Sequence, residues 1–169
     1  MRLGVEMIGD LEETPARWVK AFQEMTAGYN ENPAEILAKR FEQPAADELV
    51  ILRDIEFTSL CEHHLLPFSG VVHVAYLPGG FLVGLSKLAR LVDCYARRLQ
   101  VQERMTEQIA TAMLANLQSR AVGVVVKAHH SCMGCRGVKK PGARMITSSL
   151  LGMLRTDSAL RAEFLSLVK

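Results

Sequence analysis

The stretch LVILRDIEFTSLCEHHLLPFSGVVHVAY, residues 49–76, decides the fold because it contains two β-rich segments separated by a turn signal. From Leu49 onward apolar and polar residues alternate, which is the period of a half-buried strand. A second β-rich segment, residues 71–76, follows Pro-Phe-Ser-Gly at residues 67–70 and stops before Pro78-Gly-Gly. We expect the two segments to pair as a long antiparallel hairpin. The first strand should carry three apolar side chains on one side, namely Ile51, Ile55 and Phe57.

The residues before the hairpin, 1–45, have the pattern of a helical N-terminal segment. Thr14 followed by Pro15 is typical of a helix start, with a capping residue before a proline at the first helical position. This helix should end near Gly28, and a short second helix is expected over residues 33–41.

Two amphipathic helices are expected after the hairpin, one capped by Ser86 and one running from Gln102 to Gln118. Strands over residues 122–128 and 144–148 and a C-terminal helix from Asp157 complete the pattern. The order of strands, two helices, strands and helix predicts an α+β fold with an antiparallel sheet. The apolar faces of the two helices should carry Leu88, Leu91, Val92 and Tyr95, and Met105, Ile109, Ala112, Met113 and Leu117.

The composition fits one domain. The chain has 169 residues, of which 49% are hydrophobic and 22% charged, the balance of a globular protein with one core. Its net charge of +2 gives no reason to expect nucleic acid or a membrane as a partner. Residues 1–13 lack the basic and apolar parts of a secretory signal, so we expect a cytoplasmic location. Thiols stay reduced there, which favours metal binding or burial over disulfides for the four cysteines.

Two clusters of cysteine and histidine directly follow β-rich segments: Cys-Glu-His-His at residues 61–64 and His-His-Ser-Cys-Met-Gly-Cys at residues 129–135. Thiolate and imidazole are the ligands that zinc prefers, and two ligand sets are compatible with the spacing. A catalytic site, with a position left for water, would use Cys61, His64 and Cys132. Addition of Cys135 would instead close a structural site with four ligands. The spacing leaves both sets open.

Five other side chains of these types have simpler interpretations. His63 and His130 remain beside the ligands, where imidazoles can move protons near neutral pH. His129, one residue before His130 on a strand, should point to the opposite face and receives no role. Cys94 and His73 are expected to be buried and structural.

Four motifs in register closely resemble the GTP cyclohydrolase I family, and the resemblance covers about residues 11–167. The motifs are LCEHHL (residues 60–65), GLSKLAR (84–90), RLQVQER (98–104), and HSCM with RG (130–133 and 136–137). The resemblance implies one domain over residues 1–169, with a tunnelling fold (T-fold) over residues 46–169. That fold has an antiparallel sheet with two paired helices on one face. The implied activity is zinc-dependent hydrolysis of GTP at C8, with release of formate and rearrangement to 7,8-dihydroneopterin triphosphate.

The resemblance also assigns the reactive residues. It makes Cys61, His64 and Cys132 the ligands of Zn²⁺ and His63 and His130 the acid–base pair. This assignment favours the open, catalytic site.

The substrate groups are implied in the same way. The guanine edge would bind Glu103, with Gln102 beside it, because a carboxylate accepts from the ring N–H and the exocyclic amine. The residues implied for the triphosphate are Ser86, Lys87, Arg90 and Arg136, joined by Arg17 and Lys20 of the first helix. The last two reach phosphates across a subunit boundary in the family, whose members form a homodecamer of two stacked rings.

Two other functions stay open. Ser131 and Cys135 depart from the family pattern around Cys132, as in a related enzyme that acts on GTP or another purine nucleotide and gives a different product. A closed site that includes Cys135 would instead belong to a non-catalytic binding module with structural zinc.

Overall fold

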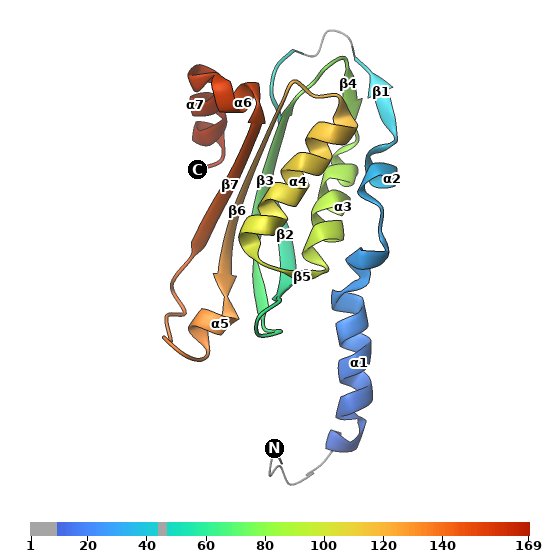
Figure 1. Ribbon diagram of the computed structural model, residues 1–169, viewed down its shortest axis with the longest axis vertical. Coiled ribbons are helices and arrows are strands. Elements are labelled where there is room, and N and C mark those ends of the chain that lie inside the picture. Colours follow the sequence, from blue (N-terminus) through green and yellow to red (C-terminus); the bar gives the residue numbers. More distant parts are fainter. Residues whose placement is uncertain (1–9, 44–46) are drawn as a thin grey trace.

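The structure is a computed structural model that describes residues 10–43 and 47–169 (Figure 1). Of the expected helical segment over residues 1–45, residues 1–9, 44 and 45 lie outside this description. None of the described helices is long and apolar enough to cross a membrane. The helices are α1 (Thr14–Met25), α2 (Pro33–Leu37), α3 (Leu85–Ala96), α4 (Gln102–Leu117), α5 (Ser131–Gly134), α6 (Met153–Thr156) and α7 (Ser158–Leu167), with the 3-10 helices η1 (Asp10–Glu13) and η2 (Ala27–Asn30). The strands are β1 (Arg40–Glu42), β2 (Val50–Cys61), β3 (Pro67–Leu77), β4 (Phe81–Val83), β5 (Leu99–Gln100), β6 (Ala121–His130) and β7 (Met145–Gly152).

Five strands form the main sheet, in the order β5-β2-β3-β6-β7. Strands β2 and β3 pair antiparallel from Val50 opposite Tyr76 to Leu60 opposite Pro67, so the expected hairpin is confirmed. The pairs β3–β6 and β6–β7 are also antiparallel, whereas the two-residue strand β5 runs parallel to β2. The predicted α+β fold with an antiparallel sheet is therefore confirmed.

A β-bulge in β2 corrects the side-chain pattern expected there. The register with β3 shifts between Leu52 and Ile55, and Asp54 has a φ of 57°. An extra residue in one strand changes the phase of the inside–outside alternation. Ile55 and Phe57 therefore belong to the core beneath α3 and α4, while Ile51 packs in the cluster on the opposite face. The prediction that all three share one side is wrong for Ile51.

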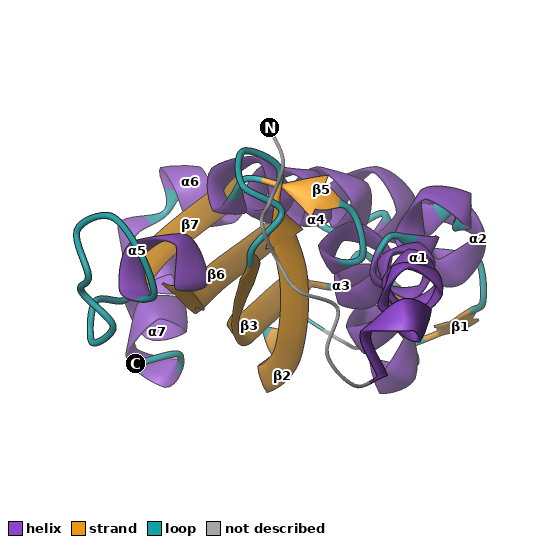
Figure 2. Ribbon diagram, turned by 90° about the horizontal axis from the view of Figure 1, so that it is seen from below, coloured by secondary structure: helices purple, strands orange, loops and turns teal. Residues whose placement is uncertain are grey.

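Helices α3 and α4 lie side by side on one face of the sheet, as predicted (Figure 1). Figure 2, which looks along the strands, shows that the sheet is curved. The opposite face is covered in part by α6 and α7, whose Leu154 and Phe164 pack against β6. Gly123 permits this contact, since a Cβ at that position would lie 2.8 Å from the Phe164 ring. The side chains that α3 and α4 bury include Leu88, Leu91, Val92, Met105, Ile109, Ala112, Met113 and Leu117, all expected from the helical period.

Three element ends differ from those expected. Thr14 is the first helical residue of α1 and does not cap it, and Gly84, not Ser86, precedes α3 as its N-cap. Helix α2 ends at Leu37 because residues 40–42 form β1, which pairs with β4. The helix expected to continue to residue 41 is therefore too long.

Helix α1 extends away from the sheet (Figure 1) and has no buried side chain. Its large apolar side chains Trp18 and Val19 are 48% and 55% exposed. The face of α1 that bears Trp18, Phe22 and Met25 therefore gains little burial within its own chain.

Candidate functional site

Three soft ligands meet at one end of the sheet, where β2 and β6 end on either side of β3. Cys61 is the last residue of β2, and a turn stabilised by hydrogen bonds from His64 N and Leu65 N to Cys61 O follows it. Strand β6 ends at His130, and α5 then carries Cys132. The ligand atoms of Cys61, His64 and Cys132 all lie within 4.8 Å of one another, with Cys61 Sγ 3.7 Å from His64 Nδ1.

The chemistry of this donor set fits zinc. Burial raises the pKa of the Cys132 thiol, and the neighbouring Cys61 thiol raises it further. A divalent cation bound between the two sulfurs would favour both thiolates and release their protons. Two sulfurs and one imidazole nitrogen are a preferred set for zinc and leave one tetrahedral position open.

Cys135 lies outside this group of ligands. It follows α5, its side chain is exposed, and its N–H donates to Ser131 O at 2.9 Å. Within residues 10–43 and 47–169, the group that could hold a metal contains Cys61, His64 and Cys132 and does not contain Cys135. The geometry thus favours the open set of three ligands over the closed set of four.

His130 lies beside the ligands in a half-buried position. Its ring stacks on Phe68, with centroids 4.6 Å apart and planes 3° from parallel, and its Nε2 is 2.8 Å from Gln102 Oε1. Burial lowers the pKa of His130, and the nearby Glu103 carboxylate opposes this shift. A neutral imidazole near pH 7 is able to accept a proton.

His63 is exposed and lies on the turn between the ligands. Its Nδ1 is 3.9 Å from Cys61 Sγ, and its Nε2 is 3.6 Å from Glu62 Oε1. A hydrogen bond from Arg104 to Glu62 lowers the pKa of that carboxyl and joins the turn to α4.

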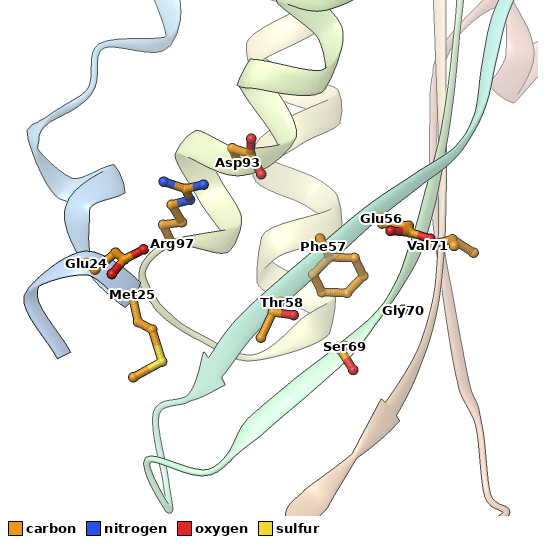
Figure 3. Close-up of a pocket in the computed structure, with 10 residues that line it drawn as sticks. All are labelled: Glu24, Met25, Glu56, Phe57, Thr58, Ser69, Gly70, Val71, Asp93 and Arg97. Atoms are coloured by element: carbon orange, nitrogen blue, oxygen red, sulfur yellow. The ribbon is translucent and has the colours of Figure 1, made fainter. Parts of the chain in front are cut away.

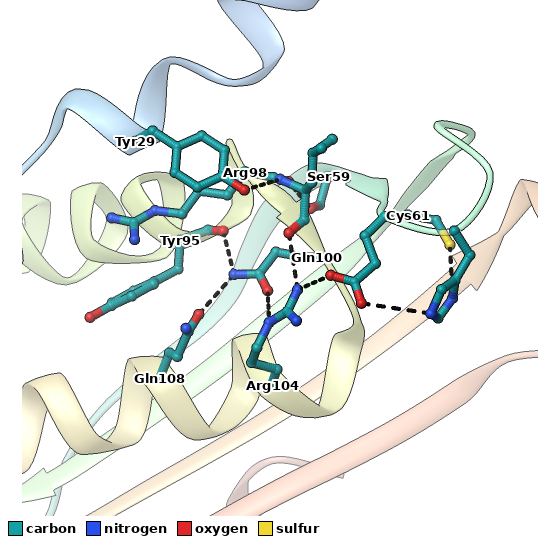
Figure 4. Close-up of polar contacts among 11 residues, drawn as sticks. Tyr29, Ser59, Cys61, Tyr95, Arg98, Gln100, Arg104 and Gln108 are labelled. Atoms are coloured by element: carbon teal, nitrogen blue, oxygen red, sulfur yellow. Dashed lines mark hydrogen bonds and ion pairs between the residues drawn. The ribbon is translucent and has the colours of Figure 1, made fainter.

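Figure 4 shows that a polar network continues behind this ion pair. Arg104 also donates to Gln100 Oε1 at 3.1 Å and to Leu99 O at 3.0 Å, and Gln100 Nε2 donates to Gln108. Sequence reasoning did not find Glu62 or Arg104 as site residues, because they are 42 positions apart and no local pattern links them.

The two residues expected at guanine differ in exposure. Glu103 is exposed and lines a groove of about 430 Å³ between α4 and β7, together with Thr106, Thr147 and Arg155. Gln102 is only 1% exposed, and its side-chain amide is bonded inside the protein. Only the Glu103 side chain is therefore open to a ligand in this structure.

The residues expected to bind phosphates do not gather at the metal end. Ser86, Lys87 and Arg90 lie on the first turns of α3, which starts at the opposite end of the sheet (Figure 1). Helix α3 runs toward β5, which pairs with Cys61, so about 15 Å of helix separates Ser86 from the metal end. Arg136 is exposed just beyond α5 and is the expected phosphate ligand placed next to the metal end.

The expected phosphate ligands of α1 are also remote. Arg17 and Lys20 are exposed, and Arg17 forms an ion pair with Glu13 at 2.6 Å. One chain thus brings together the metal ligands, His63, His130 and Glu103 but leaves the α1 and α3 residues elsewhere.

A further hollow lies away from all these residues. It has a volume of about 650 Å³ and lies between the end of α1, α3, and strands β2 and β3 (Figure 3). Glu24, Glu56, Asp93 and Arg97 line it, and none of the expected site residues does.

The matching family model and the sequence relatives of this chain share one activity name. The family model described as GTP cyclohydrolase I matches residues 6–169. The chain is 52% identical to a GTP cyclohydrolase 1 of Coxiella burnetii over 159 residues, which cover 94% of this chain and 86% of that one. It is also 52% identical to a GTP cyclohydrolase 1 of Dehalococcoides mccartyi over 161 residues, covering 94% and 85% of the two chains. Among solved structures, an archaeosine synthase QueF-like protein superposes with a TM-score of 0.49 at 22% identity, over 62% of this chain and 93% of that one.

Proposed function

We propose, from the fact that this chain belongs to the GTP cyclohydrolase I family, that it hydrolyses GTP at C8 with zinc held by Cys61, His64 and Cys132. The products would be formate and 7,8-dihydroneopterin triphosphate. The observation that carries the proposal is the meeting of three zinc-type ligands with His130, a histidine whose pKa burial lowers.

Zinc at this site would supply the acidity that turns water into a nucleophile near pH 7. The protein groups around it have separate tasks. His130 is held neutral by burial and accepts a proton. His63, which is exposed on the turn and lies next to Glu62, would donate one.

Charged side chains would bind and orient the substrate. The Glu103 carboxylate in its groove would accept hydrogen bonds from the N–H and amine on the guanine edge, which adenine lacks in that arrangement. Arg136 would bind the triphosphate from the metal end, where a guanidinium suits phosphate oxygens.

The remaining phosphate ligands would come from other copies of the chain in a homodecamer. Along β2 before Leu60, and along the outer edge of β7, no strand of the described residues pairs, so both edges remain available. Ring closure would pair such edges. It would also bring Ser86, Lys87 and Arg90 of a neighbour to the metal end, with Arg17 and Lys20 from a further copy. We place the assembly in the cytoplasm, where its thiols stay reduced.

The decisive experiment is incubation of the zinc-loaded protein with GTP, followed by measurement of formate and of a fluorescent oxidised pterin. His130→Ala should lower kcat by about 10²- to 10⁴-fold while the zinc content stays unchanged. His129→Ala is a matched control, because its strand position places it on the other face of the sheet from His130. Absence of both products from the wild-type protein would overturn the proposal.

Cys135→Ser separates this proposal from the structural-zinc alternative. An exposed thiol outside the ligand group should be dispensable, so the variant should keep its zinc and most of its turnover. Loss of both zinc and thermal stability would support the closed site. A stable formylated or ring-opened product from the wild-type protein would instead support the related enzyme with a different product.

A further inference from the structure

The side-chain amide of Gln102 is buried and fully bonded. Its Nε2 lies 3.2 Å from Val126 O, 3.2 Å from Met145 O and 3.1 Å from Thr147 Oγ1. Its Oε1 lies 2.8 Å from His130 Nε2. These contacts join α4 to strands β6 and β7 directly behind the metal end, and they use every polar atom of the amide.

The neighbours of the amide fix which of its ends is nitrogen. Two of the three groups around Nε2 are backbone carbonyls, which can only accept hydrogen bonds. The third, Thr147 Oγ1, is 2.7 Å from Thr106 Oγ1, and Thr106 in turn donates to Gln102 O at 2.7 Å. Since the Thr106 hydrogen is used on that carbonyl, the Thr147 hydrogen goes to Thr106 and the Thr147 oxygen accepts from Gln102. A flipped amide would place its oxygen against two carbonyl oxygens.

The orientation of the amide decides the tautomer of His130. Gln102 Oε1 can only accept, so the hydrogen in the 2.8 Å contact belongs to His130 Nε2. In the neutral imidazole the lone pair is then on Nδ1. Stacking on the buried Phe68 ring fixes the plane of the imidazole as well.

We propose that Gln102 is a positioning residue whose side chain acts on the reaction through His130, by fixing the ring and leaving Nδ1 as its basic nitrogen. This differs from the guanine contact implied by the family resemblance, because the 1% exposed amide has no polar atom left for a ligand. The inference rests on the proposed hydrolysis of GTP for its effect on rate. The hydrogen-bond assignment itself does not depend on that activity.

A double-mutant cycle tests this route of action. Gln102→Met keeps the size of the side chain and should lower kcat by about 10- to 100-fold, as loss of a supporting hydrogen bond to a reactive group does elsewhere. The KM for GTP should change by less than about threefold, since no substrate contact is lost. In the His130→Ala background the same change should have no further effect on kcat. Additive effects, or a KM raised in both backgrounds, would overturn the inference in favour of direct contact with GTP.

Gln100→Met is the matched control for loss of a buried amide. Gln100 is also 1% exposed, but its side chain bonds to Tyr95 O, Gln108 and Arg104 and not to His130. Its effect on kcat, whatever its size, should add to that of His130→Ala. If Gln102→Met fails to fold, Thr147→Val removes one acceptor of the amide and should show a smaller loss with the same lack of additivity.

Nitrogen NMR of selectively labelled histidine gives a readout without turnover. With the signals assigned by comparison with His130→Ala, His130 should be the Nε2–H tautomer in the wild-type protein and a mixture in Gln102→Met. An Nδ1–H tautomer in the wild type would overturn the inference even if GTP is hydrolysed. A protein that shows the expected tautomer but does not hydrolyse GTP would contradict the proposed function alone.

Discussion

At the metal end of the sheet the side chains are held by partners of their own chain, whereas at the start of α3 they are not. His130 is bonded to Gln102 and stacked on Phe68, and the turn before His64 is joined to α4 by an ion pair. Among residues 10–43 and 47–169, no ion pair or side-chain hydrogen bond involves Ser86, Lys87 or Arg90. One chain therefore holds the proposed metal ligands and proton acceptor in place, whereas the proposed phosphate ligands of α3 have no side-chain partner among the described residues.

The difference follows from what each half has to do. Metal ligands and a proton acceptor must be placed to within fractions of an ångström, and this requires buried partners that lock their rotamers. Cationic side chains attract phosphate over a longer range, so their positions can be less exact. They can stay hydrated until the anion binds and, in the proposed assembly, a second copy of the chain docks. Division of labour between copies is thus compatible with the geometry of each end.

The largest expected effect is at the metal end, from Cys132→Ser. Removal of one of three ligands should abolish stoichiometric zinc binding and lower turnover by more than about 10³-fold, because the group that activates water is lost. The fold should persist, since Cys132 is only half-buried at the margin of the core and serine is close to it in size. Zinc analysis and circular dichroism check both statements. Full activity of Cys132→Ser without zinc would contradict the assignment of the reaction to the metal end.

Mixed oligomers test whether the two halves come from different copies. The His130→Ala variant and a Lys87→Ala/Arg90→Ala double variant should each be nearly inactive at low GTP. After they are unfolded together and refolded in equal amounts, about one quarter of the sites should contain both intact halves. Turnover should recover to about that level. A mixture no more active than its components would show that each site is built within one chain.

A smaller effect is expected from Lys87→Ala alone. Loss of one charge-assisted contact to phosphate costs about 1.5–3 kcal/mol, so the KM for GTP should rise by about 10- to 100-fold with little change in kcat. Zinc content should be unchanged, because the first turns of α3 lie at the other end of the sheet. Lys39→Ala, which removes another exposed lysine with no assigned role, is the control. An equal rise in KM in both variants would point to general charge effects.

The smallest effect concerns stability and a residue that belongs to neither end. Burial lowers the pKa of His73, with Lys127 and Arg53 acting in the same direction and Asp54 opposing them. The unfolded chain takes up this proton near pH 6.5 and the folded chain only at lower pH, so stability should fall as the pH drops below about 6.5.

His73→Gln should reduce that slope by up to about 1.4 kcal/mol per pH unit, as measured by denaturant unfolding at several pH values. The slope due to His73 should be the same in the zinc-free Cys132→Ser protein. A dependence on zinc would mean that the sheet face bearing His73 is coupled to the metal end.

Much of the fold was predictable because the spacing of apolar residues along the chain indicates which side chains are buried. The hairpin and the two long helices follow from apolar spacing, and their buried residues agree with it. The bulge at Asp54 was not predictable, since a single extra residue in a strand leaves no mark on composition or turn signals. The end of α2 was missed because β1 exists only through its pairing with β4, which is a long-range contact.

The candidate site divides in the same way. The spacing indicated the two clusters that contain Cys61, His64 and Cys132, but it was equally compatible with Cys135 as a fourth ligand. In the structure Cys135 lies outside the group of possible ligands. The contact of Gln102 with His130 joins residues 28 positions apart on different elements. No sequence period connects such a pair, and only the packing of α4 against β6 reveals it.

The exposed helix α1 has a consequence for how the protein would respond to dilution. An isolated helix of 12 residues is marginal in water, and this one gains no buried side chain from its own chain. In the proposed homodecamer, a neighbour that covered Trp18 and Val19 would supply most of the order of α1, so docking and helix formation would be a single cooperative event. Dilution would then unwind α1 before it disturbed the sheet. A loss of helical circular dichroism would therefore be the first sign that the proposed assembly dissociates.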